Sequence, residues 1–315
     1  MTLSSRSTAV PRDINRRGLL KTLQQDWELY LLLLVPMLFV LLFKYGSYVG
    51  LVVAFKDYKI LKGFFASKWV GFANFQKVFA TRDFSRAFRN TLLLNGMDLL
   101  LGFPAPIILA LLLNEVRARA FKRVSQTLLY LPHFLSWVII GAIAYQLFSL
   151  SGIVNTIITN TGGKAVPFLQ ENTHWLISYL VIGVWQTMGW GTIVYLAAIT
   201  SINPELYEAA LVDGATRMQQ MFHVTLPSIR PTIVTLLIMN LGRVMGGSFE
   251  RVYALMNVAT TEYTYTIPVL VYRWGLESGR YSQATALGLF QSVIGLLLVL
   301  GSDFVAKRFG EEGLI

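Results

Sequence analysis

Several apolar stretches of about 20 residues constrain this chain more than any other feature of its sequence. A helix needs about 20 predominantly apolar residues to cross the hydrocarbon core of a bilayer. The composition agrees, because only 14% of the residues are charged, against about 25% in ordinary soluble domains. The sequence therefore predicts an all-α integral membrane protein that crosses the bilayer several times.

Six membrane-spanning helices are predicted, which places both ends of the chain on one side of the membrane. Their approximate ranges are 29–55, 89–114, 125–149, 175–200, 228–247 and 282–304. Residues 1–26 are expected to form a basic cytosolic arm, residues 27–308 the six-helix transmembrane domain, and residues 309–315 a cytosolic tail. No apolar core begins before residue 29, so we expect no cleavable signal peptide.

The polar segment 56–88 contains a short pattern that is typical of a helix. Apolar residues recur at Phe72, Phe75, Val78 and Phe79, the three- and four-residue spacing of one helix face. A helix that lies on the membrane surface fits this pattern, and so does a helix packed against the rim of the bundle.

Charge counting does not orient the predicted spans. Lys and Arg in short loops are usually cytosolic. The arm has five such residues and the 115–124 turn has four, but residues 56–89 oppose them with eight. We expect a cytosolic N-terminus, because the charges of the arm directly flank the first span.

A polar and charged segment, residues 203–227, separates the fourth and fifth spans. Asn203 can cap a helix whose first position suits Pro204, and Glu205 suits its positive end. Gly214 permits a sharp turn. Thr216 can then cap a second short helix. Two short helices joined by a glycine bend predict a docking site for another protein.

Polar side chains inside the spans are candidates for a substrate pathway, because hydrocarbon does not solvate them. Trp185 and Trp190 flank Gln186, and aromatic faces beside amides suit a sugar. Hydrogen bonding between helices explains any one amide equally well. Arg243 is the strongest candidate, since a buried cation needs a partner, which could be Asp98 or an anionic substrate. The full set is Asn95, Asp98, Gln146, Trp185, Gln186, Trp190, Asn240 and Arg243.

Other classes of site have little support in the sequence. The stretch nearest to a phosphate-binding P-loop, residues 162–165, fails on spacing and on its last residue, so we expect no ATP site of that type. The three histidines lie far apart, which argues against a metal site. The net charge of +10 is spread over the membrane flanks, so no nucleic-acid partner is expected.

Two alternatives to a simple permease remain open at this point. An intramembrane enzyme could use Asp98 or Glu250 together with a histidine, although no nucleophile or paired carboxylate accompanies them. A secondary, ion-coupled solute carrier could use Asp98 and Arg243 as an ion pair, although six spans with one long inner-loop motif fit the paired repeats and broken helices of such carriers poorly.

Residues 208–227 resemble a known motif. Glu208-Ala209-Ala210, three residues, Gly214, nine residues and Val224-x-Leu226-Pro227 resemble the coupling loop of permease subunits in binding-protein-dependent ABC importers. The family pattern has Ile where this chain has Val224. Further segments are similar to the carbohydrate branch of that family, which includes the maltose permease subunits, and most of all to LplB-like permeases. These segments are 69–75, 90–92, 130–137, 203–207 and 310–313.

The resemblance implies a type I ABC importer permease fold, with a cytoplasmic two-helix coupling loop (residues 203–227), in the bacterial cytoplasmic membrane. It implies import of a carbohydrate, in particular an oligosaccharide, with acidic oligosaccharides among the candidates. The implied partners are a second homologous permease, two ATPase subunits, an extracytoplasmic solute-binding protein and membrane lipid. ATP and Mg²⁺ would bind at the ATPase, and this chain would hold no cofactor.

The resemblance also assigns roles within the coupling loop. Glu208 would contact a cleft of the ATPase, Ala209 and Ala210 would keep the helix slim, and Gly214 would set the bend. Leu226 and Pro227 would fix the loop against the fifth span. The implied ATPase-coupling set is Glu208, Ala209, Ala210, Asp213, Gly214, Leu226 and Pro227.

Overall fold

The computed structural model describes residues 27–311, 313 and 314. The arm predicted for residues 1–26 lies outside them. The chain divides into two units, residues 1–52 and 53–315. In the described part of the first unit, α2 (Trp27–Phe39) continues through a π-helical turn (Val40–Tyr45) into a 3-10 segment (Gly46–Phe55) that enters the second unit. This stretch is long and apolar enough to cross a membrane, as predicted for the first span.

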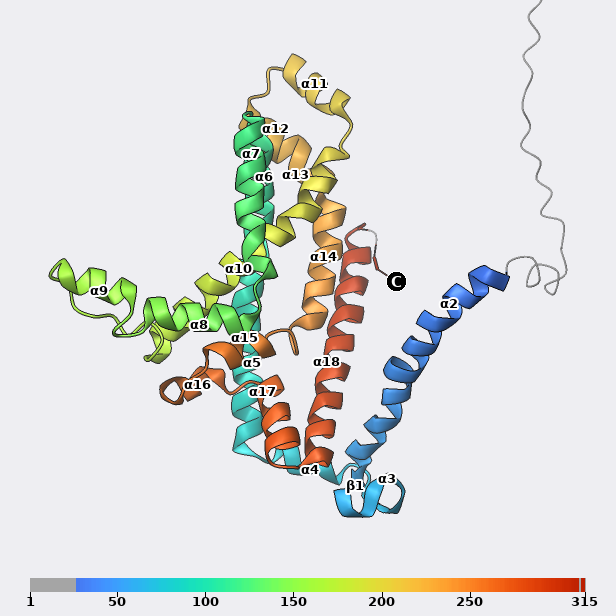
Figure 1. The fold of residues 1–315 in the computed structure, drawn as a ribbon. Coiled ribbons are helices and arrows are strands. Elements are labelled where there is room, and N and C mark those ends of the chain that lie inside the picture. Colours follow the sequence, from blue (N-terminus) through green and yellow to red (C-terminus); the bar gives the residue numbers. More distant parts are fainter. Residues whose placement is uncertain (1–26, 312, 315) are drawn as a thin grey trace, which may run out of the picture. The chain divides into compact units, whose positions relative to one another are not determined.

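The second unit is a helical bundle with one small antiparallel hairpin (Figure 1). Its elements are β1 (Lys56–Asp57), α3 (Gly63–Ala66), β2 (Lys68–Trp69), α4 (Ala73–Phe79), α5 (Arg82–Gly102), α6 (Pro104–Glu115), α7 (Arg119–Tyr130), α8 (Trp137–Phe148), α9 (Ile153–Asn160), α10 (Asn172–Thr200), α11 (Pro204–Val212), α12 (Arg217–Gln220), α13 (Leu226–Ser228), α14 (Arg230–Arg243), α15 (Phe249–Leu255), α16 (Thr261–Thr264), α17 (Ile267–Tyr272) and α18 (Tyr281–Arg308). Irregular helical turns occupy Ile60–Lys62, Leu131–Phe134, Met221–Thr225, Val258–Thr260 and Arg273–Glu277.

Among the described residues, five helical stretches are long and apolar enough to cross a membrane, or six if one bent pair counts as a span. The bent pair, Arg217–Ser228 and Arg230–Arg243, meets at 59°. This agrees with the six spans predicted from hydropathy, although the fifth span is a bent pair rather than one straight helix.

The third predicted span, 125–149, is wrong as a continuous helix. Helix α7 ends at Tyr130, a 3-10 turn follows at Leu131–Phe134, and α8 starts at Trp137. Pro132 lies in this turn and has no N–H to donate to a helix. The Ser136 hydroxyl then accepts a hydrogen bond from the Ile139 amide (3.4 Å), which caps the start of α8.

Helix α4 packs on the rim of the bundle, which decides between the two interpretations of its spacing. The Val78 side chain is buried in a cluster with Trp274 and Leu287. The Phe79 ring lies 5.2 Å from the ring of Phe290 in α18. A helix that only rested on the membrane surface would not bury Val78 in this way.

The 56–88 segment and the coupling loop lie at opposite ends of the second unit (Figure 1). At the start of α18, the Tyr58 amide donates a hydrogen bond to the Ser282 hydroxyl (2.9 Å). Beyond the other end of α18, Glu311 Oε1 lies 2.5 Å from Arg230 Nε, next to the coupling loop. The 28 residues of α18 separate these contacts by about 40 Å. The C-terminal tail therefore lies at the coupling-loop end.

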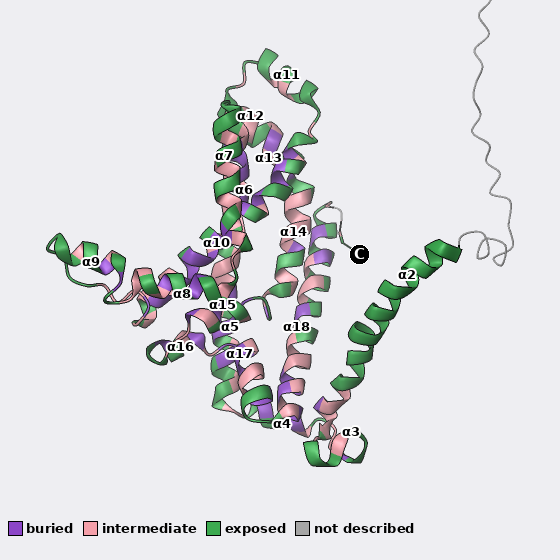
Figure 2. Ribbon diagram, viewed as in Figure 1, coloured by how far each residue is buried: buried purple, intermediate pink, exposed green. Residues whose placement is uncertain are grey.

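One of the buried clusters lies where α8, α10 and α15 meet, and the coupling loop is mostly exposed (Figure 2). Trp175 and Tyr179 of α10 are fully buried there, beside Val252 and Leu255 of α15. A Cβ atom at Gly189 of α10 would lie 1.9 Å from the Leu129 carbonyl oxygen of α7. Only glycine therefore lets these two helices pack so closely.

Candidate functional site

The first helix of the coupling loop begins at the capping residues predicted for it. The Asn203 side-chain oxygen accepts a hydrogen bond from the Glu205 amide (3.1 Å), and the Asn203 amide donates to the Glu205 carboxylate (3.1 Å). Pro204 occupies the first helical position, where its missing N–H costs no hydrogen bond. These contacts define the orientation of α11 as it leaves α10.

Gly214 makes the bend between α11 and α12. Its φ is +78°, in the left-handed region that favours glycine. The Ala215 amide donates to the Ala210 carbonyl (2.9 Å), which closes the end of α11. Thr216 and Gln219 then form a capping box at the start of α12. The bend is therefore specified by contacts within a few residues.

Polar and apolar contacts hold the coupling loop together and bind it to the rest of the bundle. The Tyr207 hydroxyl lies 2.9 Å from the hydroxyl of Thr225, a buried residue in the turn before α13. Arg217 Nη1 lies 3.4 Å from Glu115 Oε2 at the end of α6. Leu226 packs into the cluster around Ile229 and Tyr195. The loop is thus tied to α6 through Arg217, and to α10 and α14 through the cluster around Leu226.

The outward surface of the loop has no partner among the described residues. Glu208 is exposed and forms no ion pair with them. Val212 is 87% exposed, and Leu211, Met218 and Phe222 are also exposed. A hollow of about 290 Å³ opens between the two helices. It is lined by Ala210, Asp213, Gly214, Ala215, Gln219, Gln220, His223 and Val224. Exposed apolar side chains beside a carboxylate form a surface suited to binding a protein.

The polar residues predicted inside the spans do not gather at one site. The amides of Asn95 and Asn240 each donate to a carbonyl one turn back, Thr91 (2.9 Å) and Leu236 (2.8 Å). Gln186 is buried, whereas Gln146 and Trp185 are exposed. The Trp190 ring stacks on His133, with ring centres 4.6 Å apart. Hydrogen bonding within a helix accounts for two members of the set.

Asp98, one of the two partners suggested for Arg243, is bound to a different cation. Arg251 of α15 donates to the Asp98 carboxylate and also to the Tyr179 hydroxyl (2.6 Å). The Arg251 guanidinium lies 3.8 Å from the centre of the Tyr179 ring and 5.6 Å from that of Trp137. The pairing of Arg243 with Asp98 is therefore wrong, and a carrier mechanism based on that pair loses its basis.

Arg251 is the buried cation that the sequence did not reveal. It is only 8% exposed. A Cβ atom at Gly183 of α10 would lie 1.6 Å from Arg251 Nη1, so glycine makes the space for the guanidinium. The available signal was a lone cation beside Val252 and Leu255, in a segment too short to be recognised as a span. This cluster joins α5, α10 and α15.

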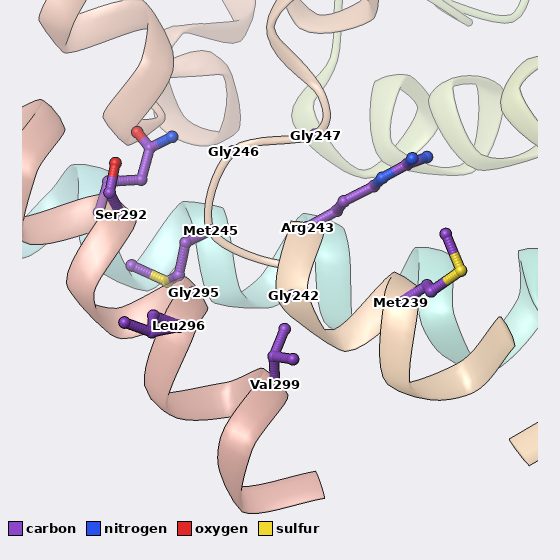
Figure 3. Close-up of a pocket in the computed structure, with 11 residues that line it drawn as sticks. Met239, Gly242, Arg243, Met245, Gly246, Gly247, Ser292, Gly295, Leu296 and Val299 are labelled. Atoms are coloured by element: carbon purple, nitrogen blue, oxygen red, sulfur yellow. The ribbon is translucent and has the colours of Figure 1, made fainter. Parts of the chain in front are cut away.

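Arg243 itself lies beside a hollow of about 490 Å³ between α14 and α18 (Figure 3). Arg243 and Met239 extend from α14 on one side, and Ser292 extends from α18 on the other. Arg243 is exposed and forms no ion pair with the described residues. The hollow is lined by Met239, Gly242, Arg243, Met245, Gly246, Gly247, Gln291, Ser292, Gly295, Leu296 and Val299.

Comparison with known proteins places this geometry in a family. The profile of the family described as "Binding-protein-dependent transport system inner membrane component" matches residues 102–311. The chain belongs to this family. The permease is 45% identical over 294 residues to Protein LplB of Bacillus subtilis (strain 168), which covers 93% of this chain and 92% of LplB.

Two further proteins are similar over nearly the whole permease. The polygalacturonan/rhamnogalacturonan transport system permease protein YteP of Bacillus subtilis (strain 168) is 43% identical over 304 residues, 96% of this chain and 94% of YteP. A chain in the crystal structure of a bacterial alginate ABC transporter, in complex with an alginate pentasaccharide-bound periplasmic protein, has a TM-score of 0.85 at 40% identity. That match covers 94% of this chain and 99% of the other.

These matches confirm the resemblance seen in the coupling loop. The protein is a multi-pass membrane permease subunit of a sugar ABC importer, with the type I importer permease fold. In this family ATP is hydrolysed by separate ATPase subunits, so the permease is not an enzyme. This function replaces the two alternative hypotheses, an intramembrane enzyme and an ion-coupled carrier.

Proposed function

We propose that this permease imports an acidic oligosaccharide and that Arg243 meets its carboxylates. YteP, named above, is a permease of a polygalacturonan/rhamnogalacturonan transport system, and a similar chain belongs to a bacterial ABC transporter involved in the import of the acidic polysaccharide alginate. The observation that carries the proposal is the exposed Arg243 guanidinium beside an open hollow, without an ion pair to a described residue. A guanidinium binds carboxylates through two parallel hydrogen bonds.

Replacement of Arg243 tests this proposal. Arg243→Ala should reduce uptake of an acidic oligosaccharide more than uptake of a neutral one, because only the acidic sugar loses a charged hydrogen bond. A charged hydrogen bond contributes about 1.5–3 kcal/mol, which corresponds to roughly 10- to 100-fold in rate. The measurement is the rate of sugar uptake into proteoliposomes at a saturating concentration of binding protein. For each sugar, the rate of the variant is divided by the rate of the unmodified permease.

Arg243→Lys is the matched control, because it keeps the charge and loses the planar fork. It should retain part of the preference for the acidic sugar. An equal fractional loss for both sugars in Arg243→Ala would remove the charge-recognition role of this residue, and a structural role would then explain the loss.

We further propose the complete assembly and its orientation. Two ATPase subunits would bind ATP and Mg²⁺, and one of them would hold the exposed face of α11 and α12. A second homologous permease and an extracytoplasmic solute-binding protein would complete the importer. The exposed carboxylate and apolar side chains of the coupling loop support the proposed contact with an ATPase subunit. The periplasmic protein in the alginate transporter complex supports the proposed solute-binding protein. The coupling loop and the C-terminal tail would face the cytosol, as would the N-terminus after six spans.

Labelling of single cysteines tests this orientation, because the natural chain has no cysteine. A membrane-impermeant maleimide should label Lys62→Cys in intact cells, since Lys62 is exposed at the end opposite the coupling loop. It should label Phe309→Cys only after permeabilisation, since Phe309 is exposed at the coupling-loop end. The reverse pattern would invert the proposed topology.

A further inference from the structure

Helix α18 ends in a glycine turn that directs the tail toward α14. Gly310 adopts a φ of +81°, in the left-handed region that favours glycine. The Gly310 amide donates to the Lys307 carbonyl (3.1 Å), and the Glu311 amide donates to the Ala306 carbonyl (3.1 Å). These two bonds form a Schellman motif, a common end of a helix at a glycine. The direction in which Glu311 leaves α18 is therefore set by local contacts.

Glu311 binds the start of α14 through an ion pair. Its Oε1 atom lies 2.5 Å from Arg230 Nε. The Glu311 side chain is only 11% exposed, so its carboxylate has lost much of its hydration, which the cation offsets. Arg230 is the first residue of α14 and follows directly the 59° bend after Arg217–Ser228. The ion pair thus attaches α18 to the point where the coupling loop becomes the fifth span.

A second contact joins the same two helices farther from the coupling loop. A Cβ atom at Gly295 of α18 would lie 2.9 Å from the Gly242 carbonyl oxygen of α14, so the two backbones lie very close together. Arg230 and Gly242 are 12 residues apart in α14, which corresponds to about 18 Å of helix. Gly242 and Gly295 both line the hollow beside Arg243 (Figure 3). Helices α14 and α18 are therefore joined both at this hollow and at their coupling-loop ends.

We propose that the pair of Glu311 and Arg230 makes α18 move together with α14 when the ATPase displaces the coupling loop. This inference rests on the contact proposed above between that loop and an ATPase subunit. The glycine contact lies at the far end of α14, whereas the ion pair joins the two ends that receive the motion of the loop. Both walls of the hollow are then driven from one loop, and Glu311 and Arg230 are positioning residues for transport.

The number of sugar molecules imported per ATP hydrolysed tests this inference. Both rates are measured in the same proteoliposomes, with binding protein and an oligogalacturonate as the sugar. A lower yield of folded importer changes both rates alike and leaves their ratio unchanged. Arg230→Glu places two carboxylates together, which repel one another. It should lower the ratio by at least about fivefold, the lower end of typical coupling between two sites, while ATP hydrolysis continues.

Arg308→Glu is the matched control, because it makes the same charge change at an exposed residue at the end of α18. Arg308 forms no ion pair with the described residues, so this variant should keep the ratio of the unmodified importer. Arg230→Glu combined with Glu311→Arg should restore most of the ratio, since it rebuilds the pair with its charges exchanged. An unchanged ratio in Arg230→Glu, an equal fall in Arg308→Glu, or no recovery in the exchanged pair would overturn the inference.

A reversible covalent bridge provides a second measurement that does not depend on charge. The natural chain has no cysteine, so Arg230→Cys and Glu311→Cys can be joined by a short bifunctional thiosulfonate and separated again by reduction. The joined variant should import sugar at the ratio of the unmodified importer and lose that ratio on reduction. A ratio that reduction does not change would contradict a role for this attachment in coupling.

Failure of this inference is distinguishable from failure of the proposed loop contact. If Glu208→Lys retains uptake driven by ATP, the proposed contact of the coupling loop with the ATPase is wrong. If Glu208→Lys abolishes uptake and Arg230→Glu keeps the normal ratio, only the role of the ion pair is overturned.

Discussion

Glu208→Lys is expected to abolish ATP-driven uptake while the permease remains folded and in the membrane. Glu208 is exposed on α11 and binds no described residue, so the fold does not depend on its charge. In the proposed assembly this carboxylate contacts the ATPase. Loss of one partner of a buried charged contact costs about 2–5 kcal/mol, and so docking should weaken by at least about 30-fold. Uptake into proteoliposomes and co-purification of the ATPase measure the effect.

Glu277→Lys is the control, because it makes the same charge change at an exposed position in the turn before α18. This variant should transport sugar and bind the ATPase normally. Gly214→Pro should fail like Glu208→Lys, because proline cannot adopt the φ of +78° that the bend requires. ATP-coupled transport by both coupling-loop variants would refute the role proposed for this loop.

Arg251→Leu should destabilise the permease strongly, in contrast to the surface changes above. The substitution leaves the partly buried Asp98 carboxylate without its cation and removes the donor to the Tyr179 hydroxyl. Removal of one partner from a buried ion pair typically costs about 3–5 kcal/mol. The expected result is a marked fall in the melting temperature of the purified permease in detergent and a low yield of folded protein.

A double variant distinguishes the effect on stability of removing the whole ion pair from the effect of removing only one of its charges. Asp98→Leu combined with Arg251→Leu should recover a large part of the lost stability, because replacement of a whole buried pair by apolar residues is often nearly neutral. Additive destabilisation in the double variant would show that the two side chains act independently, contrary to the contact between them. Transport by a stable double variant would further show that the pair is structural.

Gly183→Ala examines the same cluster from the side of α10. The added methyl group would lie 1.6 Å from Arg251 Nη1, so the guanidinium must move away from Asp98 or Tyr179. The substitution should therefore destabilise the unmodified permease but have a much smaller effect in the Arg251→Leu background. Equal effects in both backgrounds would contradict a steric contact with Arg251, since interacting positions are not additive.

Several features of the functional loop were predictable from the sequence because they depend on local contacts. The Asn203 side chain accepts a hydrogen bond from the amide of Glu205 two residues later, Gly214 adopts the positive φ of the bend, and Thr216 pairs with Gln219 three residues later. The hydropathy of the spans is likewise a local property, and it predicted a membrane bundle of six spans. The break at Pro132 was also visible in principle, since proline cannot donate to a helix.

The sequence by itself determined that this chain is a helical membrane protein with a capped, glycine-bent docking loop, since each of those features depends on residues near one another in the chain. Only the tertiary structure decided that Arg251, 153 residues from Asp98, is its partner. It also decided that the basic 56–88 segment lies at the end opposite the coupling loop, which charge counting could not resolve. Both results depend on which helices pack together, and close approach at glycines such as Gly183 and Gly189 determines that packing over long sequence separations.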